Sequence, residues 1–373
     1  MTDQAGDQTA DQAADSVQMT DDVSGVPIDA HPMSYPFDET PDNETALEIM
    51  PGVFWVRMGL PISLNHINVW MIEDGDGWAI VDTGMALPKT QAAWRDVIAK
   101  HAQGKPINRV FVTHYHPDHS GNAGFLAKEF GADLYMSQIE YLTTRAYYAE
   151  AAAAVADAAP DAVPSPWGKL AGFDEGFGGK RNAAGFKKMM TPLPMYCHVL
   201  REGDEFKIGD RDFEVLIGRG HAPEHVCLYC KDDGFMFSGD QILPRISSNV
   251  SVSSSDPTGD PLSDWLESCD RLRRRVPGDV LVLPAHNEPF KGAPARLTDL
   301  INGHEEGMRN LLTLCATPKK AVEVFSALFR REIRREHYHL ATGEALAHLN
   351  CLVGRGLMTR TVGDDGAWYF QAA

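Results

Sequence analysis

Residues 113–122 constrain the fold of this chain more than any other stretch, because they gather three imidazoles and a carboxylate within six positions. The side chains concerned are His114, His116, Asp118 and His119. Residues 109–112 form a β-branched and aromatic run that predicts a buried strand. In an extended chain the first two histidines point to the same side, and Pro117 ends the strand so that the other two groups can fold back over them. This set is suited to zinc or iron, so the stretch predicts a metal site rather than a histidine-rich surface turn.

The pattern His-x-His-x-Asp-His resembles the signature of the metallo-β-lactamase superfamily of metal-dependent hydrolases. Further segments match that family's pattern in chain order, at residues 80–84, 220–225, 238–240 and 283–286. The resemblance implies an α/β (α+β) fold, a four-layer αβ/βα sandwich with a one- or two-metal site at one edge between the sheets. It covers most of the chain, but it implies little about the substrate because this fold hosts many chemistries.

The resemblance also implies which residues bind the metal. The expected ligands are His114, His116 and His221 for one ion, Asp118, His119 and His286 for a second, and Asp240 as the bridge. Zinc is the expected metal, with iron or manganese as alternatives. His198 competes with His221 for the place of the third histidine. His221 is preferred because it follows a strand-like run and a Gly-Arg-Gly turn that lets the chain turn inward.

Three residues are expected to act beside or behind these ligands. Asp118 would orient the nucleophile or shuttle its proton, which makes it the candidate catalytic residue. Asp82 and His225 would hold ligand imidazoles by their free N–H groups, a role as much structural as catalytic.

Three further residues are candidates for contact with the substrate. Arg245 and Asn249 follow the bridging aspartate closely enough to line the mouth of the site. A guanidinium there could grip a carboxylate or phosphate, although a structural salt bridge is the favoured interpretation. His66 ends a loop that hangs over the site in the family. A histidine hydrogen-bonded within its own turn is favoured over one that touches substrate.

The formal charge of −18 is concentrated at the N-terminus. Twelve Asp and Glu residues precede Arg57, the first basic residue, which leaves about −6 for the rest of the chain. Residues 1–44 are therefore expected to be an acidic tail. Residues 1–30 are expected to be disordered, because they contain hardly an aromatic and too little apolar surface to bury. A regulatory or partner-binding arm is the less favoured interpretation.

Residues 45–316 are expected to form the hydrolase domain. Strands are expected at residues 53–58, 68–72, 78–81, 213–217 and 280–283, and helices at 89–101, 124–130, 262–276 and 295–314. Residues 138–196 form an insert relative to compact members of the family. It combines an Ala-rich helix, at 150–159, with an aromatic and Met-rich piece. A substrate lid or pocket wall and a packing or dimer element are equally favoured roles.

Residues 317–373 resemble a winged-helix domain. A helix is expected at 319–331, a second at 343–355 with Thr342 as its cap, and then a hairpin. The polar groups on the second helix are Glu344, His348, Asn350 and Arg355. They are poor partners for phosphates and bases. Packing against the hydrolase domain, or formation of a homodimer, is therefore favoured over binding of nucleic acid.

The cysteine spacing and the hydropathy of the chain indicate its cellular location. Six scattered cysteines do not form a disulfide framework, and no secretory signal precedes the first strand, so a cytoplasmic location is expected. No apolar run reaches the roughly 18 residues that a membrane span needs. Cys227 and Cys230 lie three apart in an expected strand, so their sulfurs should face opposite sides rather than form one site.

The implied chemistry is hydrolysis by a metal-activated hydroxide that attacks a carbonyl carbon or a phosphorus. A small-molecule thioester, ester or lactone is the favoured substrate, of the acyl-CoA or glutathione thioester type. A thiolate leaving group, of pKa about 8.5, needs no general acid, and the apolar insert suits an acyl chain.

An endoribonuclease or phosphodiesterase is the alternative. The acidic balance disfavours it, since polyanions bind clustered cations. β-Lactam hydrolysis ranks lower because an export signal is missing, and a non-catalytic relic site is disfavoured because every ligand is present.

Overall fold

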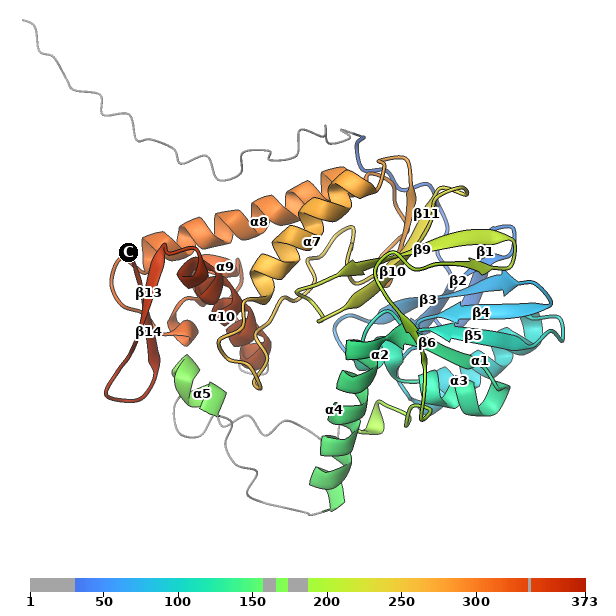
Figure 1. The fold of residues 1–373 in the computed structure, drawn as a ribbon, viewed down its shortest axis with the longest axis horizontal. Helices are drawn as coiled ribbons and strands as arrows, with labels where there is room; N and C mark the ends of the chain where they lie inside the picture. The colour runs from blue at the N-terminus through green and yellow to red at the C-terminus, as the bar shows by residue number, and fades with distance from the viewer. Residues whose placement is uncertain (1–30, 157–165, 174–186, 335–336) are drawn as a thin grey trace, which may run out of the picture.

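The computed structural model describes residues 31–156, 166–173, 187–334 and 337–373. The predicted disorder of residues 1–30 and the end of the predicted Ala-rich helix lie outside these ranges. Two sheets stand face to face, with helices on the outer side of each (Figure 1).

The first sheet has the order β1-β2-β3-β4-β5-β6-β7. Its strands are β1 (Thr45–Met50), β2 (Val53–Gly59), β3 (His66–Asp74), β4 (Gly77–Val81), β5 (Ile107–Phe111), β6 (Asp133–Ser137) and β7 (His198–Leu200). Strands β1 to β4 form an antiparallel meander, and β4 to β7 are parallel. The parallel crossovers use helices, which are α1 (Pro88–His101), α3 (Ala123–Phe130) and α4 (Gln138–Ala156).

The second sheet has the order β12-β11-β10-β9-β8. Its strands are β8 (Glu205–Ile208), β9 (Arg211–Gly218), β10 (His225–Cys230), β11 (Phe235–Gly239) and β12 (Leu281–Pro284). Strands β9 and β11 both run antiparallel to β10, and β12 runs parallel to β11. The carboxyl ends of β9, β11 and β12 therefore meet at one edge of this sheet. Helices α7 (Pro261–Arg275) and α8 (Ala293–Leu314) run side by side on its outer face (Figure 1).

Three hydrophobic clusters confirm the predicted four-layer order. One lies between the first sheet and α1 and α3, one between the two sheets, and one between the second sheet and α7 and α8. Strand alternation divides the side chains among these clusters. Cys227 and Cys230 show it on β10, because the first faces the helices and the second faces the other sheet. Their predicted orientation to opposite faces is thus confirmed.

Within the insert, α4 begins twelve positions before the expected Ala-rich helix. Helix α5 (Pro166–Ala171) lies away from α4 and packs on the third cluster through Leu170 and Trp167. Helix α5 is therefore tied to the helical layer of the C-terminal half, whereas Tyr141 of α4 and Met189 pack on the first cluster. Whether the insert also serves as a lid stays a prediction.

The C-terminal segment agrees only in part with the expected elements. A helix over residues 319–331 is wrong, because the chain there forms a 3₁₀ turn, η1 (Ala321–Glu323), and the short α9 (Phe325–Leu328). Lys319 exchanges two backbone hydrogen bonds with Phe370 of the hairpin, so its N–H and C=O groups are not available to a helix. Helix α10 (Tyr338–Gly354) starts earlier than expected, so Thr342 lies inside it and does not cap it.

The hairpin is present as expected and comprises β13 (Met358–Val362) and β14 (Trp368–Ala372). Helix α10 is buried along most of its length against α7 and α8. Packing onto the hydrolase core therefore accounts for its apolar face, whereas a winged helix as such stays a prediction. Among the described residues, helices are either too short or too polar to cross a bilayer.

Candidate metal centre

The candidate site lies where the strand ends of the two sheets face each other. The histidine-rich loop follows β5, and its Pro117 opens the short helix α2 (Pro117–Ser120), which carries Asp118 and His119. The remaining candidate ligands follow β9, β11 and β12. Because carboxyl ends of like-directed strands share one sheet edge, residues more than a hundred positions apart come together here.

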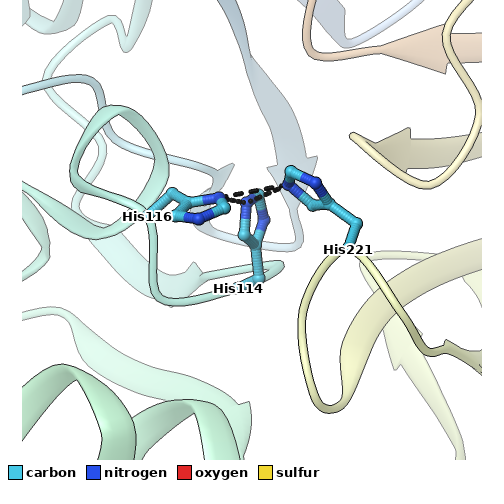
Figure 2. Close-up of side chains that lie close together, drawn as sticks. All are labelled: His114, His116 and His221. Atoms are coloured by element: carbon cyan, nitrogen blue, oxygen red, sulfur yellow. Dashed lines mark hydrogen bonds between the residues drawn. The ribbon is translucent and has the colours of Figure 1, made fainter. Parts of the chain in front are cut away.

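Three imidazoles of the first predicted set face one another (Figure 2). His114 Nε2 lies 2.7 Å from His116 Nδ1, and His221 Nε2 lies 3.1 Å from each of these two nitrogens. His114 is fully buried and the other two are partly covered. Three ring nitrogens thus point at one common position, as three ligands of a single cation do.

The second predicted set lies beside the first. His286 Nε2 is 3.5 Å from Asp118 Oδ2, and His119 Nε2 is 3.8 Å from the same oxygen. Asp240 spans both sets, because its Oδ2 is 3.4 Å from His221 Nε2 and 3.5 Å from His119 Nε2, while its Oδ1 is 3.4 Å from His286 Nε2. The structure therefore brings all the predicted ligands into one cluster and puts Asp240 between the two sets.

The donor atoms fit divalent cations. Ligands about 2.1 Å from a tetrahedral cation lie about 3.4 Å apart, close to the separations around Asp240. His119 Nε2, His286 Nε2 and Asp240 Oδ1 are buried and have no hydrogen-bond partner among the described residues. Leaving such atoms unpaired costs roughly 1–3 kcal/mol each. Coordination of a cation would satisfy all three atoms.

The pKa shifts of these residues also indicate that positive charge is favoured between the carboxylates. Burial opposes ionisation of Asp118, but the imidazoles of His119 and His286 outweigh it and lower the pKa of this carboxyl to about 2. Burial also lowers the pKa of His116, to about 3. Burial disfavours charge on His119 as well, yet Asp82, Asp240 and Asp118 raise its pKa well above the ordinary value. A cation at this position would replace the proton that His119 otherwise holds.

Asp82 lies behind both sets of candidate ligands. Its Oδ2 accepts from His119 Nδ1 at 2.8 Å, which leaves Nε2 free for a metal. Its carboxylate also accepts from the Thr113 hydroxyl and the Thr113 backbone N–H. In the tautomer that frees His114 Nε2, His114 Nδ1 donates to the same threonine at 3.0 Å. One buried carboxylate thus orients one histidine of each set.

Backbone carbonyls orient two further ligands, which the sequence does not reveal. His221 Nδ1 donates to the carbonyl of Asn249 at 2.8 Å, and His286 Nδ1 donates to the carbonyl of His66 at 2.9 Å. His66 therefore acts on the site through its main chain. Its ring contacts Asn65 and the backbone N–H of Asn287. This agrees with the favoured interpretation of a locally hydrogen-bonded histidine.

Glu140 of α4 is the main residue that sequence reasoning missed. It is fully buried and accepts two backbone N–H groups, from Tyr115 at 2.9 Å and from Glu224 at 2.7 Å. The first lies between His114 and His116, and the second lies three residues after His221. A single carboxylate therefore clamps together the two loops that carry the first ligand set. Burial raises its pKa to about 7 despite these two hydrogen bonds.

His225 differs from the expectation. Its Nε2 accepts the backbone N–H of Asp240 at 3.0 Å, so it fixes the main chain of the bridging residue and does not hold a ligand imidazole by an N–H. Its ring lies against that of His114, with 4.8 Å between centroids. The role is still one of support, but its target is the main chain of Asp240 rather than a histidine ring.

Two other candidates lie in structural interactions. Arg245 pairs with Glu288 at 2.8 Å and lies over the ring of Tyr35, which agrees with the favoured salt bridge. His198, the rival third ligand, belongs to edge strand β7 and stacks on Tyr135, and it is absent from every metal-binding group found among the described residues.

The four layers and the cluster of histidines and aspartates at the sheet edge define a hydrolase with a metal centre. The chain belongs to the metallo-β-lactamase superfamily, whose family pattern matches residues 63–286. Residues 308–373 match a second family, the metallo-β-lactamase-like C-terminal domain.

Two relatives share this similarity. The acyl-coenzyme A thioesterase MBLAC2 of Bos taurus is 27% identical over 248 residues, which cover 64% of this chain and 79% of the relative. The probable metallo-hydrolase YqjP of Bacillus subtilis is 25% identical over 319 residues, covering 82% of this chain and 94% of the relative.

Two solved structures share the fold over most of the chain. A β-lactamase domain protein from Burkholderia ambifaria is 36% identical, with a TM-score of 0.79 over 91% of this chain and 97% of that one. A metallo-β-lactamase family protein from Thermus thermophilus aligns with a TM-score of 0.72 over 87% of this chain and 100% of that one, at 24% identity.

Proposed function

We propose that this hydrolase cleaves a small-molecule thioester of the acyl-CoA or glutathione type. The observation that carries the proposal is the position of Asp240 between two sets of ligands, because a two-cation centre suits attack of water on an acyl carbon. Cations bound there would supply Lewis acidity and would bring the pKa of a water molecule toward neutrality.

The residues themselves supply positioning. Asp118 has a depressed pKa and so remains an anion that can accept a hydrogen bond from the attacking water and orient it. The supporting hydrogen bonds of Asp82 and of the Asn249 carbonyl keep the imidazoles aimed before substrate arrives. A thiolate leaves without protonation, because its pKa is about 8.5. This step therefore needs no general acid, in contrast to expulsion of an alkoxide or amine.

The similarity to an acyl-coenzyme A thioesterase supports this substrate class. An endoribonuclease is less well supported. The arginines near the end of α7 are already paired, Arg271 with Glu202, Arg273 and Arg274 with Asp270, and Arg275 with Glu214. Paired cations contribute little to binding of a polyanion. The burial of α10 removes a second surface on which nucleic acid could dock.

A substrate panel tests the proposal. Metal-loaded protein is offered acyl-CoA thioesters of increasing chain length, a glutathione thioester, a lactone and single-stranded RNA, and release of thiol or acid is recorded alongside RNA integrity. We expect a thioester to give the highest kcat/KM, of at least about 10⁴ M⁻¹s⁻¹. His116→Ala, which removes a nitrogen of the first ligand set, should abolish turnover. Cleavage of RNA by protein that leaves every thioester intact would refute the proposal.

A further inference from the structure

The C-terminal helix α10 reaches the metal centre through residues 248–252, the linking segment. At its first residue, the Ser248 hydroxyl donates to the carbonyl oxygen of Asp240. At its second, the carbonyl oxygen of Asn249 accepts from His221 Nδ1 at 2.8 Å. The linking segment thus contacts the bridging carboxylate residue and a histidine of the first set.

The same segment is fixed to α10 by its other groups. Asn249 Nδ2 donates to Glu344 Oε2 at 2.9 Å, and Asn249 Oδ1 accepts from the Ser251 hydroxyl, so the amide is held at both ends. The backbone N–H of Val252 donates to the carbonyl oxygen of Gly343 at 3.1 Å. Two adjacent residues of α10 therefore hold the segment whose carbonyl orients His221.

The packing leaves little room for this segment to shift. Val250 and Val252 are buried in the cluster that also contains Leu346 and Leu349 of α10. A Cβ atom on Gly343 would lie 2.9 Å from the side chain of Ser251, so this close approach requires glycine. A rotation of Asn249 would consequently need α10 to move as well.

We propose that Glu344 is a positioning residue of the metal centre, acting through Asn249 to hold His221 Nδ1 and thereby aim His221 Nε2. The C-terminal segment then contributes to the site directly, in addition to covering the hydrolase core. The inference rests on the metal centre of the proposed function, but it is independent of the substrate class.

Metal affinity is the property that tests this role. Apo-protein is titrated with Zn²⁺ against a competing chelator, and with Co²⁺ while the absorption bands of the bound ion are recorded. We expect Glu344→Ala to weaken one of two equivalents by about tenfold, the lower end of the range for residues that support a metal ligand, and to alter the Co²⁺ bands. Glu344→Gln keeps an oxygen that accepts from Asn249 Nδ2, so it should stay within about twofold of wild type.

Two further variants distinguish a specific loss of metal affinity from a general loss of folding. Glu305→Ala breaks the ion pair with Arg355, which also joins α8 to α10 but does not touch the linking segment. It should leave the affinity for both equivalents unchanged. Asn249→Ala keeps the carbonyl and loses both side-chain anchors, so it should reproduce the defect of Glu344→Ala. If Glu344→Ala does not fold, Asn249→Ala carries the test, with Glu305→Ala as its control.

A double-mutant cycle completes the test. Glu344→Ala combined with Asn249→Ala should lose no more affinity than either change alone, because both break one chain of contacts. The inference is overturned by wild-type affinity and Co²⁺ bands in Glu344→Ala, by an equal loss in Glu305→Ala, or by additive losses in the double variant. These measurements do not involve turnover, so they would still test the role of Glu344 if the thioesterase assignment were wrong.

Discussion

Asp82 holds His119 through a hydrogen bond of 2.8 Å between Oδ2 and Nδ1, and it does so from a backbone conformation with φ of 60°. Such a left-handed conformation is unfavourable for most residues, although Asp and Asn tolerate it best. The carboxylate is 2% exposed and also accepts from Thr113. Backbone strain is thus retained where one side chain supports ligands of both sets.

Asp82→Asn should weaken metal binding more than it weakens folding. Asparagine tolerates the same backbone conformation, but its neutral amide is a poorer acceptor for His119 Nδ1–H, so the imidazole loses basicity and orientation. We expect a loss of about 10- to 100-fold in affinity for the ion bound by His119. Chelator competition measures it. An affinity equal to wild type would show that Asp82 serves the fold alone.

Asp82→Ala provides the contrast. It leaves the buried backbone N–H of Thr113 without its acceptor, so it should also reduce the free energy of unfolding by about 1–3 kcal/mol in metal-free protein. Urea unfolding of both variants separates the two effects.

The candidate ligands could be predicted because the histidine-rich stretch and the segments at 220–225, 238–240 and 283–286 resemble the family pattern. Strand-like runs before them place these residues at strand ends, and the shared edge follows from strand direction. The supporting contacts of Asn249 and Glu140 could not be found this way. Asn249 acts through a carbonyl that every residue has, and Glu140 sits in a helix whose position over the two loops is set by tertiary packing.

The C-terminal errors have a similar cause. Residues 319–331 have a sequence compatible with a helix, but the pairing of Lys319 with Phe370 uses that backbone for a bridge to the hairpin. The Glu323 side chain then accepts from the backbone N–H of Lys320 and closes a tight turn. Local propensity is a weak guide where tertiary hydrogen bonds compete for the same groups.

Glu140 leads to a prediction about stability. Glu140→Gln keeps one acceptor oxygen and puts an NH₂ group where the second was, so one of the two clamped N–H groups loses its partner. We expect unfolding of the metal-free protein to require about 1–3 kcal/mol less free energy, and Glu140→Ala to lose more. Chemical denaturation followed by circular dichroism gives these values.

The matched control for this clamp is Glu129→Gln. Glu129 forms an exposed ion pair with Arg95, and exposed pairs contribute little because water screens them. Equal losses in Glu140→Gln and Glu129→Gln would contradict the clamp.

Glu344 gives the folded protein a distinctive pH dependence. Burial raises the pKa of its carboxyl from 4.5 to about 7, against a smaller opposing effect of the hydrogen bond from Asn249. Between these two values the folded chain holds a proton that the unfolded chain does not. Stability from this group is therefore fully present below the lower value and is lost as the pH rises toward about 7.

Glu344→Gln removes this titration and keeps the contact with Asn249. We expect the wild type to lose on the order of 3 kcal/mol relative to the variant over that rise. Metal-free unfolding curves at several pH values measure the difference, and histidine titration common to both proteins cancels. Parallel curves for the two proteins would argue against a raised pKa at Glu344.

The two-set geometry predicts how metal stoichiometry responds to single substitutions. His221→Ala removes a nitrogen of the first set only, and His286→Ala removes one of the second set only, so each variant should retain about one tightly bound equivalent of Zn²⁺. Asp240→Ala should weaken both equivalents, because its two oxygens lie within 3.5 Å of His221, His119 and His286 nitrogens. Elemental analysis after dialysis against a weak chelator counts the bound ions. If Asp240→Ala retained one tight equivalent, as the single histidine variants should, Asp240 would belong to one set only, and the assignment of a shared carboxylate would be wrong.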